Sequence, residues 1–386
     1  MRNQLPTLSL SIHFPWCIQK CPYCDFNSHT VKQGIPEQEY INALLTDLEN
    51  DLPLVWGRKV NTIFMGGGTP SLFSAQATDQ LLSGIRARIP LSSQAEITLE
   101  ANPGSVENSK LKDFFDVGIN RLSLGVQSFH DEQLQLLGRI HDAETAISAV
   151  QMAKQAGFEN INIDIMFALP NQTLAQAIAD VETAISLKPT HISYYQLTIE
   201  PNTEFHHHPP SLPNDDLAWE IYMAGRNKLV ENKFSQYEVS AYALEKQHSR
   251  HNMNYWLFGD YLGIGAGAHA KISNANEQTI TRYWKHRHPK DYLSMKNNSA
   301  ITGQNTLQQQ EILFEFLMNG LRLTNGFELT TFEQHTGVEK NQLLQMLDQH
   351  ITNQLVIWDE SNNRIKTSDQ GQLFLNSILE NLLPAD

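Results

Sequence analysis

Apolar and polar positions alternate with the two-residue period of a β-strand in six segments of the first half of the chain. Between several of these segments, apolar positions recur with the period of an amphipathic helix. The predicted strands are residues 8–13, 60–65, 96–101, 119–127, 161–168 and 191–197, and the predicted helices include 37–52, 78–88, 143–156 and 174–187. Gly118 and Gly157 stand where helices should end. This order predicts a parallel sheet with right-handed crossover connections.

Polar residues at the strand ends distinguish the two architectures that fit this order, an open doubly wound sheet and a partial β/α barrel. In a β/α barrel the functional groups collect at the carboxyl ends of the strands. The first predicted strand leads to a cysteine cluster, and the second leads to three consecutive glycines. The third ends at Glu100, the fourth ends at Gln127, and the fifth contains Asp164. We therefore expect an α/β fold with a partial (β/α)6 barrel.

The pattern changes after the sixth strand. A long helix is predicted at 215–232 and a strand at 236–240, followed by a stretch rich in glycine and aromatic residues. From about residue 307, three helical patterns (309–320, 328–335 and 340–350) precede two short strands (355–359 and 364–367) and a last helix. This is a winged-helix-like order in a small, mainly α C-terminal domain. The predicted division is 1–240 for the barrel, 241–305 for an aromatic and glycine-rich connecting segment, and 306–386 for the C-terminal domain.

Charge and hydropathy indicate which classes of binding partner and which cellular locations to expect. The net charge is −14, and residues 306–386 hold four Lys or Arg against eleven Asp or Glu, which argues against nucleic-acid binding by the winged-helix-like part. No stretch approaches the roughly twenty apolar residues that span a bilayer. The N-terminal residues show no apolar signal core and no small-residue cleavage site. We expect a cytoplasmic protein that does not bind nucleic acid.

The chain has only three cysteines, Cys17, Cys21 and Cys24, in the spacing C-x3-C-x2-C. A cubane [4Fe–4S] cluster needs a ligand on each of its four irons, so three thiolates leave one iron open. The amino and carboxylate groups of S-adenosylmethionine can chelate such an iron. The alternative is a structural zinc ion completed by His13 or His29. Zinc ligands usually come as two closely spaced pairs, and no second pair lies nearby in the sequence, which favours the cluster.

Several longer motifs accompany the cysteines. They are HFPWC and CPYCDFNSH around the cluster, FMGGGTP at 64–70, EANP at 100–103, SLGVQSF at 123–129, GRIH at 138–141, DIMFALP at 164–170 and HNMNYW at 251–256. Over nearly the whole chain, these motifs resemble the radical S-adenosylmethionine superfamily. Within it, the sequence is most similar to the subgroup related to oxygen-independent coproporphyrinogen III oxidase, and in that subgroup to the HemW branch of heme chaperones. The resemblance implies that residues 306–386 form a HemN-type C-terminal domain.

The resemblance also implies which residues contact S-adenosylmethionine. They are Tyr23, Gly67, Gly68, Thr69, Glu100, Gln127, Arg139 and Asp164. The residues by themselves leave other roles open: packing beneath the loop for Tyr23, a tight turn for the glycines, helix capping or an ion pair for Glu100, and a solvated surface charge for Arg139. One departure concerns the position six residues before the first cysteine, where the oxidase relatives commonly have Tyr and this chain has Ser11.

Two positions separate a heme chaperone from an oxidase. The oxidase relatives typically carry a further cysteine two residues after the third cluster cysteine, where this chain has Phe26. The residues of the motif HNxxYW alone favour a turn capped by Asn and anchored by a buried Trp, and it is the resemblance to the HemW branch that implies His251 as a heme contact. We therefore expect a heme chaperone without coproporphyrinogen oxidase activity, and the alternative is an oxygen-independent coproporphyrinogen III oxidase.

The expected cofactors and partners follow from that resemblance. They are a [4Fe–4S] cluster, S-adenosylmethionine, heme, and respiratory proteins that accept the heme. Radical chemistry on RNA or protein is disfavoured by the acidic charge and by the motifs. The sequence leaves peripheral membrane contact, a homodimer and cleavage of S-adenosylmethionine open.

Overall fold

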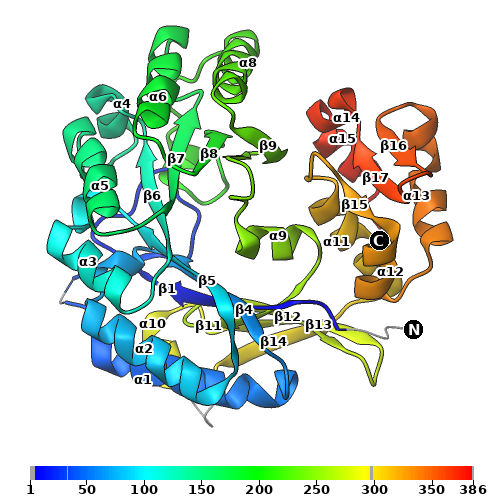
Figure 1. The fold of residues 1–386 in the computed structure, drawn as a ribbon, viewed down its shortest axis with the longest axis horizontal. Helices are drawn as coiled ribbons and strands as arrows, with labels where there is room; N and C mark the ends of the chain where they lie inside the picture. The colour runs from blue at the N-terminus through cyan, green and yellow to red at the C-terminus, as the bar shows by residue number, and fades with distance from the viewer. Residues whose placement is uncertain (1–4, 33, 296–298, 385–386) are drawn as a thin grey trace.

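In the computed structural model, which describes residues 5–32, 34–295 and 299–384, a twelve-stranded sheet forms the centre of the molecule (Figure 1). Six of its strands lie side by side in chain order, and each pairs in parallel with the next. They are β1 (Leu8–Phe14), β4 (Val60–Gly67), β5 (Leu91–Ala101), β6 (Arg121–Gln127), β7 (Asn160–Phe167) and β8 (His191–Gln196). The predicted α/β fold is confirmed: the six parallel strands expected for a partial (β/α)6 barrel are present in chain order, within a larger open mixed sheet.

Helices cover the outer side of the parallel strands (Figure 1). They are α1 (Glu37–Asp51), α2 (Ala75–Arg88), α3 (Asn108–Asp116), α4 (Asp131–Leu136), α5 (Ala143–Gln155), α6 (Leu174–Ser186) and α8 (Asp215–Glu231), with the one-turn helix α7 (Glu204–His207) in the connection before α8. The local sequence explains where several of these helices begin or end. Thr173 and Gln176 form a capping box at the start of α6. Gly118 and Gly157 follow α3 and α5 with a φ of 106° each, the left-handed conformation that glycine adopts without strain.

Further strands extend the sheet at both edges. β11 (Asp260–Ile264) pairs in parallel with β1, and β12 (His269–Asn274), β13 (Thr279–Lys285) and β14 (Ile301–Thr306) follow as antiparallel neighbours. At the other edge, β10 (Ala241–Ala243) and β9 (Ser235–Glu238) lie next to β8. The sequence predicted only a connection for 241–305. The structure forms sheet strands there, together with α9 (Arg250–Trp256) and α10 (Pro289–Leu293).

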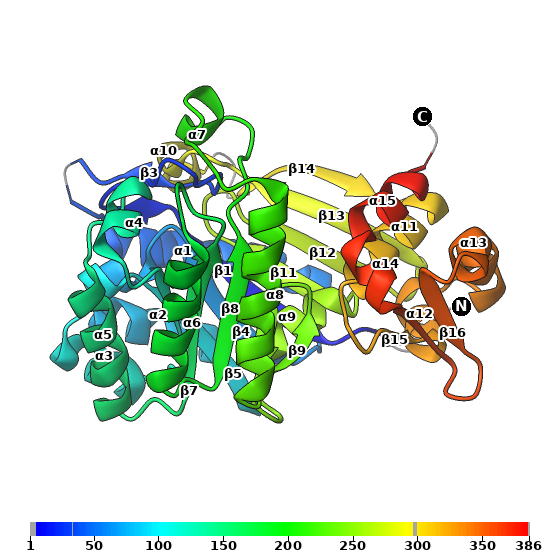
Figure 2. The same cartoon turned by 90° about the horizontal axis from the view of Figure 1, so that it is seen from above.

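The C-terminal part lies beyond the antiparallel strands (Figure 2). It contains α11 (Gln309–Gly320), β15 (Phe327–Glu328), α12 (Leu329–Thr336), α13 (Lys340–Thr352), β16 (Val356–Asp359), β17 (Arg364–Thr367), α14 (Asp369–Leu373) and α15 (Leu375–Asn381). The three helices and the two strands occur in the predicted order, so the mainly helical C-terminal domain is confirmed. The exact domain limits stay a prediction.

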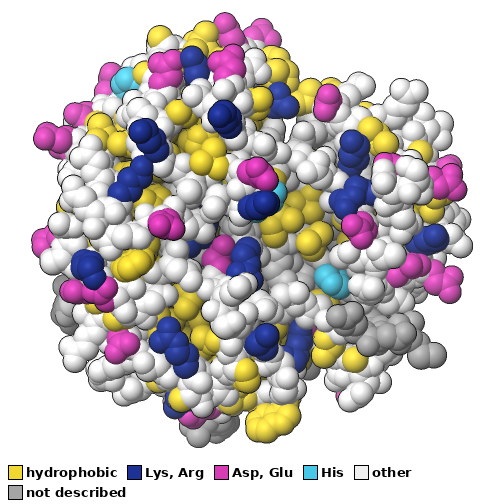
Figure 3. Space-filling view, in the orientation of Figure 1, with side chains coloured by type: hydrophobic (Ala, Val, Ile, Leu, Met, Phe, Trp, Pro, Cys, Tyr) yellow, Lys and Arg dark blue, Asp and Glu magenta, His cyan; other side chains and the backbone are white. Residues whose placement is uncertain are grey.

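One hydrophobic cluster connects the C-terminal part to the sheet region. Its centre is Phe316, Phe327 and Phe332, and it includes Phe258 before β11 and Ile280 in β13. In the orientation of Figure 1, hydrophobic side chains also gather on the surface between α9 and the C-terminal helices, with Lys and Arg side chains beside them (Figure 3). None of the helices in the described part of the chain combines the length and the apolar character that crossing a bilayer requires.

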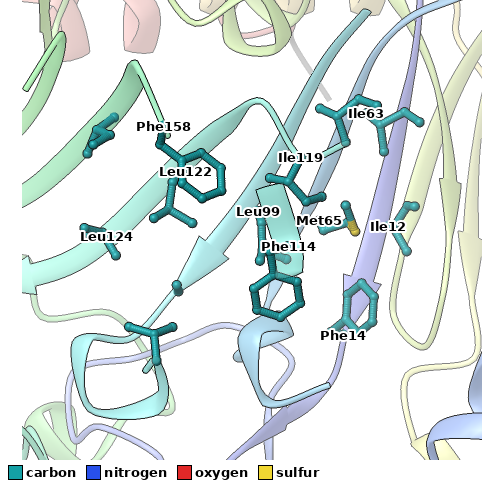
Figure 4. Packing of buried hydrophobic residues seen from close by; sticks show 14 of the residues in the cluster. Ile12, Phe14, Ile63, Met65, Leu99, Phe114, Ile119, Leu122, Leu124 and Phe158 are labelled. Carbon is teal, nitrogen blue, oxygen red and sulfur yellow. The ribbon is translucent and has the colours of Figure 1, made fainter. Parts of the chain in front are cut away.

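The main core lies between the parallel strands and the helices outside them (Figure 4). In β6, Leu122, Leu124 and Val126 are fully buried in this core. Because successive side chains of a strand point to opposite faces, Ser123, Gly125 and Gln127 of the same strand face the inner side of the sheet. The alternation therefore places apolar groups outside and polar groups inside.

Candidate functional site

A cavity opens at the carboxyl ends of the parallel strands, where the sequence predicted a functional site. It lies between the cysteine loop and the inner side of the strands from β4 to β8. Its lining includes Cys17, Cys21, Cys24, Tyr23, Gly67, Gly68, Thr69, Glu100, Gln127, Arg139 and Asp164. Every residue predicted for the cluster and for S-adenosylmethionine is therefore at this one cavity, and the roles assigned to them stay predictions.

The cysteine loop connects two short strands, β2 (Trp16–Cys17) and β3 (His29–Thr30), which pair in parallel. Backbone hydrogen bonds hold the loop: within it, Cys24 N–H donates to the Cys21 carbonyl at 3.1 Å, and across its ends, Val31 N–H donates to the Cys17 carbonyl at 2.9 Å. The loop therefore has a defined shape within the protein, with all three half-buried thiols at the same cavity.

The thiols fit a cluster that carries positive charge on its irons. Burial raises the pKa of Cys17 and of Cys24, and the neighbouring Cys21 raises both further, so thiolates at these positions need a cation. Among the described residues, no group of three or more His, Cys, Asp or Glu side chains is spaced to hold one metal ion, as the zinc alternative would require. In a cubane cluster each thiolate binds its own iron, so the thiols need not converge on one point.

The three glycines at the carboxyl end of β4 have a structural role that is visible in the geometry. A Cβ at Gly68 would lie 2.6 Å from the Trp16 carbonyl oxygen, and a Cβ at Gly66 would lie 2.8 Å from Oε2 of Glu100. Gly68 N–H donates to the Phe14 carbonyl at 2.7 Å. The absence of side chains thus allows the cysteine loop and the Glu100 carboxyl group to approach the end of β4 closely.

Two acidic side chains face this cavity together. Burial, and the nearby Asp164 carboxylate, raise the pKa of Glu100 to about 7, although Gly67 N–H donates to Oε2 of Glu100 at 3.2 Å. Burial also raises the pKa of Asp164, and hydrogen bonds from Asn162 at 2.8 Å and from Ser123 at 3.4 Å oppose that shift. Two buried carboxyl groups near one another favour a cationic ligand, because a cation compensates for the charge that burial disfavours.

Arg139 is directed into the cavity rather than to solvent. Its Nη2 donates to the Gly125 carbonyl at 2.6 Å, and its Nη1 lies 3.5 Å from the Cys21 sulfur. Gln127 ends β6 with a φ of 74°, a left-handed conformation that is uncommon outside glycine, and its Oε1 accepts a hydrogen bond from Tyr195 Oη at 2.8 Å. Arg139 therefore offers a positive charge on the same cavity, suited to a carboxylate group.

Tyr23 packs beneath the cysteine loop and also borders the cavity, and its contact with a ligand stays a prediction. Its ring lies 6.5 Å from the ring of Phe205 and belongs to a small apolar cluster under the loop. The residue also lines the cavity. Packing thus fixes the position of the ring that borders the site.

Sequence reasoning missed the residues that support the predicted ones. Tyr195 of β8 lines the cavity, and a buried chain of contacts runs from Asp164 through Asn162 to His191, whose Nδ1 lies 2.6 Å from Oδ1 of Asn162. The two-residue period offered a signal for these positions. Asn162 stands two residues before Asp164 on the same face, and Tyr195 is near the carboxyl end of the sixth strand.

His251 is not at this cavity, and its geometry does not support the predicted heme contact. The side chain is buried beneath the sheet, with Nδ1 2.8 Å from Thr62 Oγ1 and Nε2 3.1 Å from Ser11 Oγ. Its ring stacks on Phe64 at 5.0 Å. Because both ring nitrogens are engaged, neither is free to bind a heme iron. The motif HNxxYW forms α9, a helix packed against β1 and β4.

The contact between α9 and β1 explains why a small serine stands at position 11. Its hydroxyl group lies 2.7 Å from Tyr255 Oη and 3.1 Å from the imidazole of His251. The small side chain of Ser11 thus meets two rings from α9, whereas the oxidase relatives commonly place a tyrosine on the strand itself.

Comparisons with known proteins agree with the fold. Residues 11–184 match the family model of the radical SAM superfamily, and residues 307–374 match that of the HemN C-terminal domain. The chain is 47% identical to the heme chaperone HemW of Haemophilus influenzae and 46% identical to that of Escherichia coli, with 98% of each chain covered in both comparisons. The solved structure of coproporphyrinogen III oxidase (HemN) from Escherichia coli, a radical SAM enzyme, has a TM-score of 0.82 at 21% identity and covers 99% of this chain and 91% of its own, which shows a shared fold.

Proposed function

Because the chain belongs to the HemW family of heme chaperones within the radical SAM superfamily, we propose that it binds heme and delivers it to other heme proteins, among them respiratory proteins. The observation that carries the proposal is the identity of 47% to a heme chaperone over 98% of both chains. We further propose that Cys17, Cys21 and Cys24 hold a [4Fe–4S] cluster whose open iron binds S-adenosylmethionine.

The cavity residues then have distinct roles toward that ligand. Glu100 and Asp164 face its positively charged groups, and Arg139 faces its carboxylate. Gly67, Gly68 and Thr69 let the ligand approach the backbone at the end of β4, while Tyr23 borders it from the cysteine loop. Gln127, held by Tyr195, contributes a polar amide to the same wall. When bound, the cluster supplies the electron that can cleave the sulfonium of S-adenosylmethionine.

The oxidase alternative is disfavoured by Phe26. This position borders the cluster cavity, and it carries an exposed benzyl group where the oxidase relatives typically have a further cysteine. The likeness to the solved oxidase structure concerns the fold alone at 21% identity. We therefore propose that the chain lacks coproporphyrinogen oxidase activity.

Two measurements on one anaerobically reconstituted preparation test this function. Heme titration should give stoichiometric binding, and mixing the heme-loaded protein with an apo-form heme protein should transfer the heme. Incubation with coproporphyrinogen III, S-adenosylmethionine and a reductant should yield no protoporphyrinogen. Product formed over several turnovers, or a protein that does not bind heme, would overturn the proposal. A Cys24→Ala variant, which lacks one cluster ligand, shows whether heme binding requires the cluster.

A further inference from the structure

A second cavity adjoins the cluster cavity. The two share Phe26, Gly67 and Glu100 in their linings, so these residues lie at their common boundary. The second cavity extends away from the parallel strands toward β12 and β13, where its lining includes His269, Trp284 and Arg287. Its volume of about 810 Å³ lies in the range of pockets that hold large organic ligands.

His269 is the accessible imidazole of this cavity. It begins β12 and is exposed, and its in-register partner on the neighbouring strand is Trp284. Within the described residues, the His269 side chain has no hydrogen-bond partner. This distinguishes it from His251, whose ring nitrogens are both engaged, and from His13, whose Nε2 lies 2.8 Å from the Asn27 carbonyl. A histidine imidazole is a common protein ligand of a heme iron, and it needs a free ring nitrogen to bind the iron.

Two aromatic side chains expose flat apolar surfaces into the same cavity. Trp284 is 36% exposed and Phe26 is 58% exposed, although aromatic side chains of this size are usually buried. One comes from β13 and the other from the cysteine loop. Neighbouring exposed aromatics at a cavity indicate a ligand with a large apolar face.

The cationic groups of the cavity differ in their availability. Lys285 is buried, and its Nζ lies 2.7 Å from carboxylate oxygens of both Asp47 and Asp51, so its charge is already compensated. Arg287 is exposed, and in the described part of the chain its guanidinium group has no ion-pair partner. Arg287 is therefore the residue that can bind a carboxylate of an incoming ligand.

We infer that this second cavity is the heme site of the chain, with His269 as the ligand of the iron, Trp284 and Phe26 against the porphyrin, and Arg287 at a propionate. The inference rests on the proposed heme binding and adds its location. An imidazole, two aromatic faces and an unpaired guanidinium match the iron, the ring and the carboxylates of one ligand. The site places heme beside the cluster cavity, with Phe26 between them.

Heme titration of the cluster-loaded full-length chain and its variants tests the location. His269→Ala should weaken heme binding by about tenfold or more and change the Soret band, and added imidazole should restore the band of the wild-type protein. His206→Ala, an exposed histidine on α7, is the matched control and should bind heme unchanged. The iron–sulfur absorbance should stay the same in both variants, which separates a local effect from a misfolded protein.

The propionate contact has its own test. The wild-type protein should bind heme more tightly than heme dimethyl ester, in which both carboxylates are blocked. In Arg287→Ala this preference should disappear, and Arg287→Lys should recover part of it. Wild-type protein that does not bind heme would contradict the proposed function as a whole. Wild-type protein that binds heme, with His269→Ala equal to it in affinity and spectrum, would overturn only the location inferred here.

Discussion

Glu100 and Asp164 show how the protein prepares a site for positive charge at the scale of single residues. Both carboxyl groups are withdrawn from water, which raises the pKa of each, and the Asp164 carboxylate raises the pKa of Glu100 further. Asp164 is supported by hydrogen bonds from Asn162 and Ser123, whereas Glu100 accepts a hydrogen bond from the Gly67 amide. Glu100 is therefore the carboxyl group whose protonation changes near neutral pH.

This difference predicts a pH dependence of ligand binding. Because the pKa of Glu100 is raised to about 7, its carboxyl group is mostly protonated below pH 7 and must lose a proton before it can pair with a cationic ligand. We expect the affinity of the cluster-loaded protein for S-adenosylmethionine to fall by about tenfold for each pH unit below that value and to level off above it. Equilibrium binding measured across this range under anaerobic conditions gives the slope.

Two substitutions control for other titrating groups. Glu100→Gln should bind S-adenosylmethionine more weakly above pH 7, and its affinity should lose the dependence on pH. Glu107→Gln removes an exposed carboxylate outside the cavity and should behave as the wild-type protein. An unchanged slope in Glu100→Gln would show that another group takes up the proton.

At the scale of secondary-structure elements, the residues of the motif HNxxYW form helix α9. The Glu96 carboxylate accepts hydrogen bonds from the backbone N–H groups of Arg250 and His251, at 3.1 and 3.0 Å, and so caps the start of the helix. His251 then reaches Thr62 and Ser11 on two strands of the sheet. These contacts hold α9 against the sheet, and His251 is a structural residue.

This role predicts that His251 contributes to stability in a pH-dependent way. Burial lowers the pKa of His251 to about 3, so between pH 6.5 and 3 the unfolded chain binds one more proton there than the folded protein. The free energy of unfolding should therefore fall with decreasing pH, by about 1.4 kcal/mol per pH unit from this group. In His251→Gln, which does not titrate, we expect a loss of about 1–3 kcal/mol at pH 7 that narrows as the pH falls.

Urea denaturation at several pH values measures this effect, with His206→Gln as the exposed control. Parallel stability curves for the wild-type protein and His251→Gln would refute the assignment. Heme affinity provides a second readout, because His251→Gln should bind heme as the wild-type protein does if His269 is the iron ligand. Loss of heme affinity in a folded His251→Gln protein would instead favour the contact predicted from the motif.

The same elements show what the sequence could and could not predict. Parallel strands have long apolar runs and end in functional groups, so β1 and β4 to β8 and the site residues at their ends were recognisable. The strands β11 to β14 were not, because short strands have weak patterns. The burial of His251 depends on Ser11 and Thr62, which are 240 and 189 residues away in the chain, and no local pattern carries that information.

At the scale of the whole molecule, Arg322 connects three regions. It lies in the C-terminal part after α11, and its Nη2 donates to Oε2 of Glu238 in β9 at 3.0 Å. Its guanidinium group also lies over the ring of Trp256 in α9, 4.5 Å from the ring centroid. Glu238 is almost fully buried, at 2% exposure, so its carboxylate depends on this partner and on nearby hydrogen bonds from Ser240.

Removal of Arg322 should therefore loosen the C-terminal part from the sheet. Arg322→Ala leaves the buried carboxylate of Glu238 without its cation, a change that typically costs about 3–5 kcal/mol when a buried pair is broken. Since Arg322 is itself partly exposed, we expect about 2 kcal/mol. Differential scanning calorimetry should show a lower transition temperature and a broader or divided transition, with the iron–sulfur absorbance unchanged at low temperature.

The double variant Arg322→Ala with Glu238→Gln decides whether the ion pair is responsible. If the lost stability comes from an unpaired buried charge, the neutral amide should recover part of it, because Gln needs no cation. If the cation–π contact with Trp256 is responsible, the second substitution should recover nothing, and Trp256→Leu alone should reproduce the defect. A third outcome is that Arg322→Ala proves as stable as the wild-type protein. That result would mean that the hydrophobic cluster of Phe316 and Phe258 joins the C-terminal part to the sheet region and that Arg322 does not contribute.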